Sequence, residues 1–326
     1  MRKLLVLLVV VCLRFIHSFA QTSEWPPSAD HLTLPLGANG APGQKMGSGP
    51  EADTTTMRDR LVAGKRVIRI GNVTAPTLTL YKPQARNTET AVVVFPGGSY
   101  KILAIDLEGT EVCDWFASIG VTCILVKYRV PDSGPYPKSA AALQDAQRAL
   151  GLVRSHAAEW KIDPQRIGVL GFSAGAHLSP ALGTHFEKRL YDPIDMADPL
   201  SCRPDFGVIV YPGYVALADQ NFAVNPDIPV TQQTPPTFIV QAEDDPVHVE
   251  NATVYFIALK NAKVPAELHI YAEGGHGYGL RQTALPITTW PQSVETWLHT
   301  IDMLVQSEKP SRERQTKKLT RSRTRF

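Results

Sequence analysis

Five short, uninterrupted apolar runs recur along the chain and constrain its fold more than any other feature. They are AVVVFP (91–96), VTCILVKYRV (121–130), RIGVLGF (166–172), DFGVIVYP (205–212) and PTFIVQAED (236–244). An apolar run of this length is typical of a strand that is buried on both faces of a parallel sheet. Since segments with helical spacing separate most of the runs, the sequence predicts one α/β domain, with a mostly parallel central sheet and helices on both faces.

The remaining elements are expected from apolar spacing. Helices are predicted at 108–119, 139–160, 174–186, 249–262 and 290–305, and one more strand at 266–272. The segment VIRIGNVTAPTLTLYKP (67–83) alternates apolar and polar residues, which predicts an antiparallel strand pair before the first buried run.

The first 20 residues have the pattern of a signal peptide. Met1-Arg2-Lys3 is a charged start, residues 4–13 are apolar, and Ser18-Phe19-Ala20 supplies small residues before a cleavage point. Ten apolar residues are too few to span a bilayer. We therefore expect a secreted or periplasmic protein without a membrane span.

Charge is divided unevenly along the rest of the chain. Residues 21–60 are rich in Gly, Pro and Thr without periodicity, which predicts an extended arm packed over a body at 61–308. Residues 21–308 hold 22 basic and 30 acidic side chains, whereas residues 309–326 hold eight Lys or Arg and one Glu. The terminal segment is predicted to be a disordered basic tail. Its only aromatic residue is Phe326, so nucleic acid is not an expected partner.

Three cysteines follow the leader, namely Cys113, Cys123 and Cys202. Their odd number excludes a fully paired framework, and no C-x-x-C spacing indicates a metal site. No cofactor motif is present, so neither a metal nor a cofactor is expected. Cys113 and Cys123 lie in apolar contexts and are interpreted as small core residues, although an exported protein leaves room for one disulfide.

The pattern G-x-S-x-G places Ser173 between Gly171 and Gly175, where a buried run meets a helical segment. A tight strand-to-helix turn needs small neighbours, and it exposes the serine hydroxyl at the carboxyl edge of the sheet. The amides at the start of the following helix face the point where negative charge would develop. This context favours a nucleophile over a serine that only caps a helix.

A serine nucleophile needs a base, and an acid must orient that base. In this arrangement the chain order is serine, acid, histidine. Asp245 and His276 follow the runs ending near 244 and 272, so both are expected at the carboxyl edge. Asp244 is the rival acid and Glu243 a weaker one. Asp245 is preferred because the sequence DPV opens the turn there.

Amide donors for an oxyanion are the third requirement. The segment FPGGSY (95–100) follows the first buried run, and its two glycines let the backbone turn amides inward. The predicted donors are the amide of Gly98 or Ser99, together with that of Ala174. Two other histidines have simpler interpretations: His177 as a packing residue and His248 as loop surface.

Taken together, the motifs resemble those of exported α/β-hydrolases of the acetyl-xylan-esterase and feruloyl-esterase-like group, related to hormone-sensitive-lipase-like esterases. The resemblance extends from about Leu78 to Leu304 and rests on VVVFPGGSY, IDLEG, VKYRVP, RIGVLGFSAGAHL, RPDFGVIVYPGY and AEDDPVHVEN. It implies the α/β-hydrolase fold and a Ser–Asp–His esterase, with those roles at Ser173, Asp245 and His276. Ser99 and Ala176 stand where the group usually has glycine, and both are expected to narrow the acyl pocket.

The leading hypothesis is a secreted serine carboxylic-ester hydrolase for short acyl groups. Acetyl esters of plant polysaccharide such as xylan are the expected substrates, cleaved through an acyl-enzyme intermediate. One alternative is a peptidase or lipase on the same fold, although residues 216–236 are too polar and proline-rich for a lipase lid. Another is a non-catalytic carbohydrate-binding hydrolase homologue, which would be expected to lack part of the triad.

Overall fold

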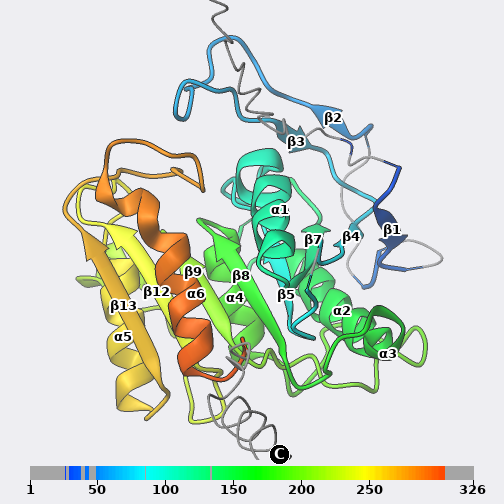
Figure 1. Cartoon of the computed structure of the whole chain (residues 1–326). Helices are drawn as coiled ribbons and strands as arrows, with labels where there is room; N and C mark the ends of the chain where they lie inside the picture. The colour runs from blue at the N-terminus through cyan, green and yellow to red at the C-terminus, as the bar shows by residue number, and fades with distance from the viewer. Residues whose placement is uncertain are drawn as a thin grey trace, which may run out of the picture.

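The computed structural model describes residues 26, 29–37, 41–43, 49–84, 86–132 and 134–304 (Figure 1). The predicted signal peptide and basic tail lie outside these residues. An eight-stranded sheet forms the centre, and only β4 runs antiparallel to the other strands. In spatial order its strands are β1 (Leu32–Pro35), β4 (Thr77–Tyr81), β7 (Thr122–Lys127), β5 (Ala91–Phe95), β8 (Ile167–Phe172), β9 (Gly207–Val210), β12 (Thr237–Ala242) and β13 (Ala266–Tyr271). The predicted α/β class with a mostly parallel sheet is confirmed.

Helices cover both faces of the sheet. They are α1 (Glu111–Ser118), α2 (Ala141–Ser155), α3 (Ala157–Trp160), α4 (Gly175–Thr184), α5 (Glu250–Asn261) and α6 (Trp290–Thr300), with the short turns η1 (Asp106–Thr110), η2 (Ala218–Gln220) and η3 (Pro286–Thr289). Adjacent residues of β12 point to opposite faces, as a strand requires. Phe238 contacts Trp297 of α6, whereas Ile239 packs with Tyr255 of α5. In Figure 1, α1 and α6 therefore lie over one face of the sheet and α5 over the other.

Two small sheets border the central one. One contains β2 (Ala52–Asp53), β3 (Arg69–Gly71) and β6 (Leu103–Ala104), and the other contains β10 (Ala216–Leu217) and β11 (Ala223–Val224). The predicted pairing within 67–83 is wrong, because β3 pairs with β2 and β6 while β4 pairs with β1 and β7. β1 and β2 come from the segment that was predicted to be an arm, and they pair with β4 and β3, respectively. The edges they occupy are therefore not available for β3 and β4 to pair with each other.

Two helix predictions also need correction. The helix expected at 139–160 is divided into α2 and α3 at His156, whose ring stacks on Trp160 at a centroid distance of 4.8 Å. The last helix ends at Thr300 rather than 305, because the amides of Met303 and Leu304 turn back to the carbonyl of Leu298. The strand-to-helix connection at 172–175 is where the sequence placed it.

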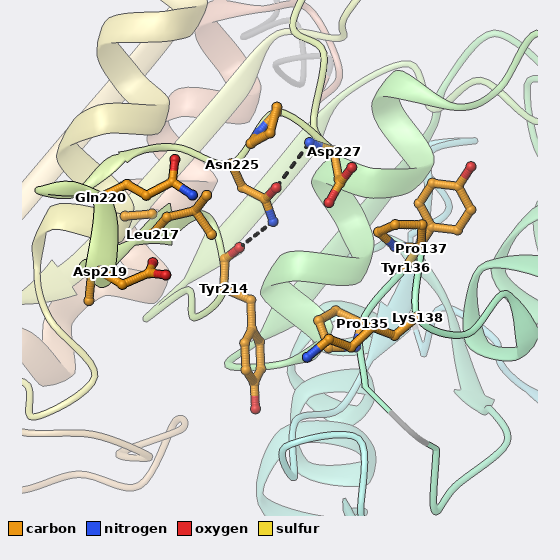
Figure 2. Close-up of a pocket in the computed structure, with 13 residues that line it drawn as sticks. Pro135, Tyr136, Pro137, Lys138, Tyr214, Leu217, Asp219, Gln220, Asn225 and Asp227 are labelled. Carbon is orange, nitrogen blue, oxygen red and sulfur yellow. Dashed lines mark hydrogen bonds between the residues drawn. The ribbon is translucent and has the colours of Figure 1, made fainter.

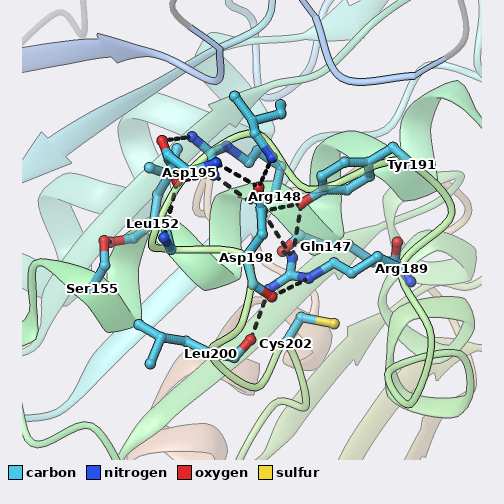
Figure 3. Close-up of polar contacts among 12 residues, drawn as sticks. Gln147, Arg148, Leu152, Ser155, Arg189, Tyr191, Asp195, Asp198, Leu200 and Cys202 are labelled. Atoms are coloured by element: carbon cyan, nitrogen blue, oxygen red, sulfur yellow. Dashed lines mark hydrogen bonds and ion pairs between the residues drawn. The ribbon is translucent and has the colours of Figure 1, made fainter.

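A buried polar network fixes residues 189–198 against α2 (Figure 3). Arg148 forms ion pairs with Asp195 at 2.5 Å and with Asp198 at 3.0 Å. Its Nε also donates to the carbonyl of Leu36 at 2.7 Å. One arginine on α2 therefore holds both this long connection and the segment beside β1.

Cys113 of α1 and Cys123 of β7 form a disulfide, and both residues are fully buried. The interpretation as simple core residues was therefore incomplete, because the same pair also crosslinks a helix to the sheet. Cys202 is a buried free thiol.

Removing this disulfide is expected to lower the free energy of unfolding. The crosslink closes a short loop, since the two cysteines are ten residues apart, and a loop of this size is worth about 2–3 kcal/mol. Urea unfolding of the Cys113→Ala/Cys123→Ala variant measures the loss. The control is Cys202→Ala, which removes a buried thiol without removing a crosslink. Equal losses in the two variants would show that packing alone explains the effect.

Candidate active site

Ser173 occupies the sharp turn between β8 and α4. Its φ of +52° is a left-handed conformation that is uncommon outside glycine. Both flanking glycines are required by close packing. A Cβ at Gly171 would lie 2.0 Å from the carbonyl oxygen of Gly175, and one at Gly175 would lie 2.0 Å from that of Phe95. The G-x-S-x-G spacing is therefore what allows the strand, the serine and the helix to meet.

The structure brings together the three side chains that the sequence singled out. His276 Nε2 lies 2.8 Å from Ser173 Oγ, and His276 Nδ1 lies 2.9 Å from Asp245 Oδ2. Asp245 is buried, whereas the His276 side chain is 22% exposed. This hydrogen-bonded series can transfer the serine proton to the imidazole and stabilise the resulting imidazolium with a buried carboxylate.

The two candidate acids have different surroundings. Asp245 also accepts hydrogen bonds from the Gln241 side chain at 3.0 Å and the Val247 amide at 2.7 Å. Asp244 is exposed, and its Oδ1 accepts from the amides of Gly274 and Gly275 at 2.9 and 2.7 Å. Asp245 thus contacts the histidine ring, and Asp244 holds the loop that carries it.

The segment predicted to bind an oxyanion turns sharply beside Ser173. Gly98 has a φ of +133° and Ser99 a φ of +58°. Both residues line the same cavity as Ser173 and His276. Within the described residues, the amides of Gly98, Ser99 and Ala174 donate to no protein acceptor, so all three are available to a substrate oxygen.

Glu108 is a buried residue of the site that residue-by-residue reasoning missed. Its carboxylate accepts from the amide of Gly97 at 2.6 Å and from the hydroxyl of Tyr211 at 2.8 Å. The Tyr211 ring in turn packs edge-on against His276, with centroids 4.9 Å apart. Burial raises the pKa of the Glu108 carboxyl above its ordinary value. Glu108 therefore supports both the oxyanion segment and the histidine; its only sequence signal was its place in the IDLEG motif.

Tyr100 anchors the oxyanion segment from the other side. Its hydroxyl lies 2.9 Å from Nδ1 of His177, and both side chains are buried. Burial lowers the pKa of His177 to about 3, so its ring is neutral near pH 7. The packing interpretation of His177 is consistent with this contact, and His248 is exposed as expected.

A cavity of about 210 Å³ opens beside Ser173 and His276. Its apolar lining comes from Val62, Val67, Ile102, Ala104 and Leu107. Ser99 lines it, as expected, but Ala176 does not. Ala176 is fully buried and packs with Ile209 and Tyr255 in a cluster that is separate from the cavity lining, because the first turn of α4 directs its side chain away from the cavity. The expectation that Ala176 narrows the acyl pocket is therefore wrong.

A second cavity of about 630 Å³ lies between residues 135–138 and the segment 214–227 (Figure 2). Tyr214 connects it to the site, since its ring contacts those of Tyr100 and His177 at centroid distances of 6.0 Å. Asn225 fixes this wall by donating to the Tyr214 carbonyl and accepting from the Asp227 amide. The cavity thus presents aromatic, proline and aliphatic surface together with five polar side chains, close to the oxyanion segment.

In the described part of the chain, no helix is long and apolar enough to cross a membrane. The same residues contain no group of three His, Cys, Asp or Glu side chains that could hold a metal ion.

Comparisons with known proteins agree with this geometry. A family model described as BD-FAE matches residues 78–206, and one described as the prolyl oligopeptidase family matches residues 204–299. An acetylxylan esterase of Xylanibacter ruminicola is 30% identical over 218 residues, which are 58% of this chain and 41% of that protein. Endo-1,4-beta-xylanase B of Butyrivibrio fibrisolvens is 29% identical over 220 residues, or 62% of this chain and 34% of that protein. The chain therefore spans well under half the length of these two relatives.

A solved structure is similar over a larger share of both chains. The acetyl ester-xyloside bifunctional hydrolase from Caldicellulosiruptor lactoaceticus is 36% identical with a TM-score of 0.62, and the match covers 72% of this chain and 91% of that one. The chain belongs to the acetyl-xylan-esterase-like α/β hydrolases and carries a serine carboxylesterase domain.

Proposed function

We propose that the protein hydrolyses short acyl esters, above all acetyl esters on plant polysaccharide such as xylan. The observation that carries this proposal is the hydrogen-bonded series from Ser173 through His276 to Asp245 beside a cavity of only about 210 Å³. A cavity of this size accommodates an acetyl group together with the adjoining part of an alcohol, which favours a short acyl chain when both parts of the ester must fit. The names of the acetylxylan esterase and the acetyl ester-xyloside hydrolase support the same substrate class.

The reaction proceeds through two acyl transfers. Ser173 Oγ attacks the ester carbonyl carbon while His276 Nε2 takes the hydroxyl proton. The carbonyl oxygen becomes an oxyanion that accepts from the amide of Ala174 and from Gly98 or Ser99. Collapse of this intermediate breaks the bond to the alcohol, and His276 returns its proton to the departing oxygen. Water then repeats the sequence on the acyl-enzyme, which releases the acid and the free serine.

Two features support action on a polymer outside the cytoplasm. The first is the 630 Å³ cavity beside Tyr214, whose aromatic and polar lining suits sugar units next to the esterified one (Figure 2). The second is the Cys113–Cys123 disulfide, since disulfides persist mainly in exported proteins. Together with the leader pattern of residues 1–20, these features favour a secreted or periplasmic protein.

Acyl-chain length gives the direct test. We expect kcat/KM to fall at least about tenfold from 4-nitrophenyl acetate to the butyrate and to be negligible for the octanoate, because each excluded methylene costs about 1–3 kcal/mol. Acetic acid should also be released from acetylated xylan. Ile102→Ala, which enlarges the cavity, should raise the butyrate rate relative to acetate, and the exposed Ile257→Ala serves as control. A wild-type optimum at octanoate would contradict the proposal.

A peptidase is the second candidate, because the prolyl oligopeptidase model matches the half of the domain that contains Asp245 and His276. Chromogenic proline amides distinguish the two functions. An amidase rate comparable to the acetyl-ester rate would favour the peptidase. The lipase alternative has less support, since Asp219, Gln220, Asn225 and Asp227 occupy the segment where an apolar lid would be needed.

A further inference from the structure

The segment 56–71, which we call the flap, covers one side of the catalytic cavity. Within it, β3 pairs with β6, and β6 directly follows the oxyanion segment. Val62 and Val67 supply part of the apolar wall of the cavity. The flap is therefore a wall of the site, although it lies more than 100 residues before Ser173 in the chain.

A buried arginine holds the flap in place. Arg281 donates from Nη1 to the carbonyls of Lys65 and Arg66, at 3.2 and 2.7 Å. Its Nη2 forms ion pairs with Asp106 at 3.0 Å and Glu111 at 2.7 Å. Arg281 is only 8% exposed and follows His276 by five residues. The position of the flap relative to the catalytic histidine is thus fixed before any substrate binds.

The flap is strongly basic although the body of the protein is acidic. It contains five Lys or Arg residues and only one carboxylate, that of Asp59. Two of the basic side chains, Arg60 and Arg69, line the catalytic cavity. Arg69 lies 3.4 Å from Asp59, whereas Arg60 is exposed and has no carboxylate within ion-pair distance among the described residues. The cavity therefore has an apolar inner wall and an exposed, positively charged side, while the one carboxyl group that lines it, Glu108, is buried and already hydrogen-bonded to Gly97 and Tyr211.

The part of a substrate that meets this charged side follows from the chemistry of the triad. His276 lines the same cavity and must protonate the departing alcohol. The apolar wall of Ile102, Ala104 and Leu107 is large enough to contact the whole of a short acyl group. The exposed guanidinium of Arg60 is then left to meet the larger alcohol.

We propose that the flap selects esters whose alcohol carries an anionic group, a carboxylate or a sulfate, close to the scissile bond. This inference rests on the proposed esterase function and narrows its substrate class to acetylated acidic saccharides. A guanidinium beside a partly enclosed cavity attracts an anionic ligand and raises its rate of association.

Three acetyl esters of similar shape provide the test. They are 4-acetoxybenzoate, 4-acetoxybenzenesulfonate and the neutral 4-acetoxybenzamide, and each enzymatic kcat/KM is divided by the rate constant for hydroxide hydrolysis of the same ester. At low ionic strength we expect both anions to be favoured over the amide by about tenfold or more, and 1 M NaCl to reduce that ratio. A preference for only one anion would identify the group recognised.

Variants assign the effect to the flap. Arg60→Gln should lower the anion-to-amide ratio about fivefold, and Arg60→Gln/Arg69→Gln should bring it to about 1. Arg58→Gln is the matched control, because Arg58 is an exposed arginine of the same flap that does not line the cavity. Hydrolysis of all three esters at equal corrected rates by the wild type would overturn this inference alone. Failure to hydrolyse any of them would instead contradict the proposed esterase function.

Discussion

Replacing Ser173 with alanine is expected to reduce kcat for 4-nitrophenyl acetate by about 10⁶-fold, the loss typical of a triad whose members act as a unit. Among the described residues, the Ser173 hydroxyl is the only nucleophilic side-chain group hydrogen-bonded to His276 Nε2, at a distance of 2.8 Å. Ala lacks that oxygen but fits the turn, so thermal unfolding should be nearly unchanged. Ser118→Ala, on the exposed end of α1, is the control. Near-normal turnover in a folded Ser173→Ala protein would refute the serine mechanism.

Asp245→Asn is expected to lower kcat about 10⁴-fold, because an amide no longer fixes the histidine tautomer or stabilises the imidazolium. Asp244→Asn is the matched control from the adjacent position. Both backbone hydrogen bonds that Asp244 accepts go to Oδ1, an acceptor that asparagine retains. Its loss should therefore stay below about tenfold.

The comparison of these two variants is decisive only if both proteins fold. Circular dichroism and thermal unfolding of each should precede the kinetics. If Asp244→Asn lowered kcat more than Asp245→Asn, the assignment of Asp245 as the catalytic acid would be wrong. Its contact with His276 at 2.9 Å would then not act in catalysis.

The parts of the site that the sequence could predict are those that local geometry dictates. A serine between glycines at a strand-to-helix boundary has few conformations, and the structure gives Ser173 the expected tight turn, with the backbone in a left-handed conformation. His276 was recognisable because it follows a strand and is flanked by glycines. Asp245 and Asp244 follow the same strand, so preferring one over the other depended on how the turn opens.

The parts that escaped prediction depend on contacts between distant segments. Glu108 joins Gly97 to Tyr211, a residue 103 positions later in the chain. The strands β3 and β6 are three and two residues long, too short to produce a periodic signal. The direction of Ala176 depends on how α4 is rotated against the sheet, and residue spacing does not reveal that rotation.

The edge strand β1 has a consequence for how the protein behaves in concentrated solution. Without β1, the five-residue strand β4 would present unpaired backbone amides and carbonyls that another molecule could extend into a shared sheet. β1 covers that edge, and it is itself a poor template, because it is only four residues long and ends in Pro35, which has no amide hydrogen to donate. β1 thus protects the protein against aggregation, and a truncation past Pro35 made to ease crystallisation or expression would leave the edge of β4 open to pairing with another molecule.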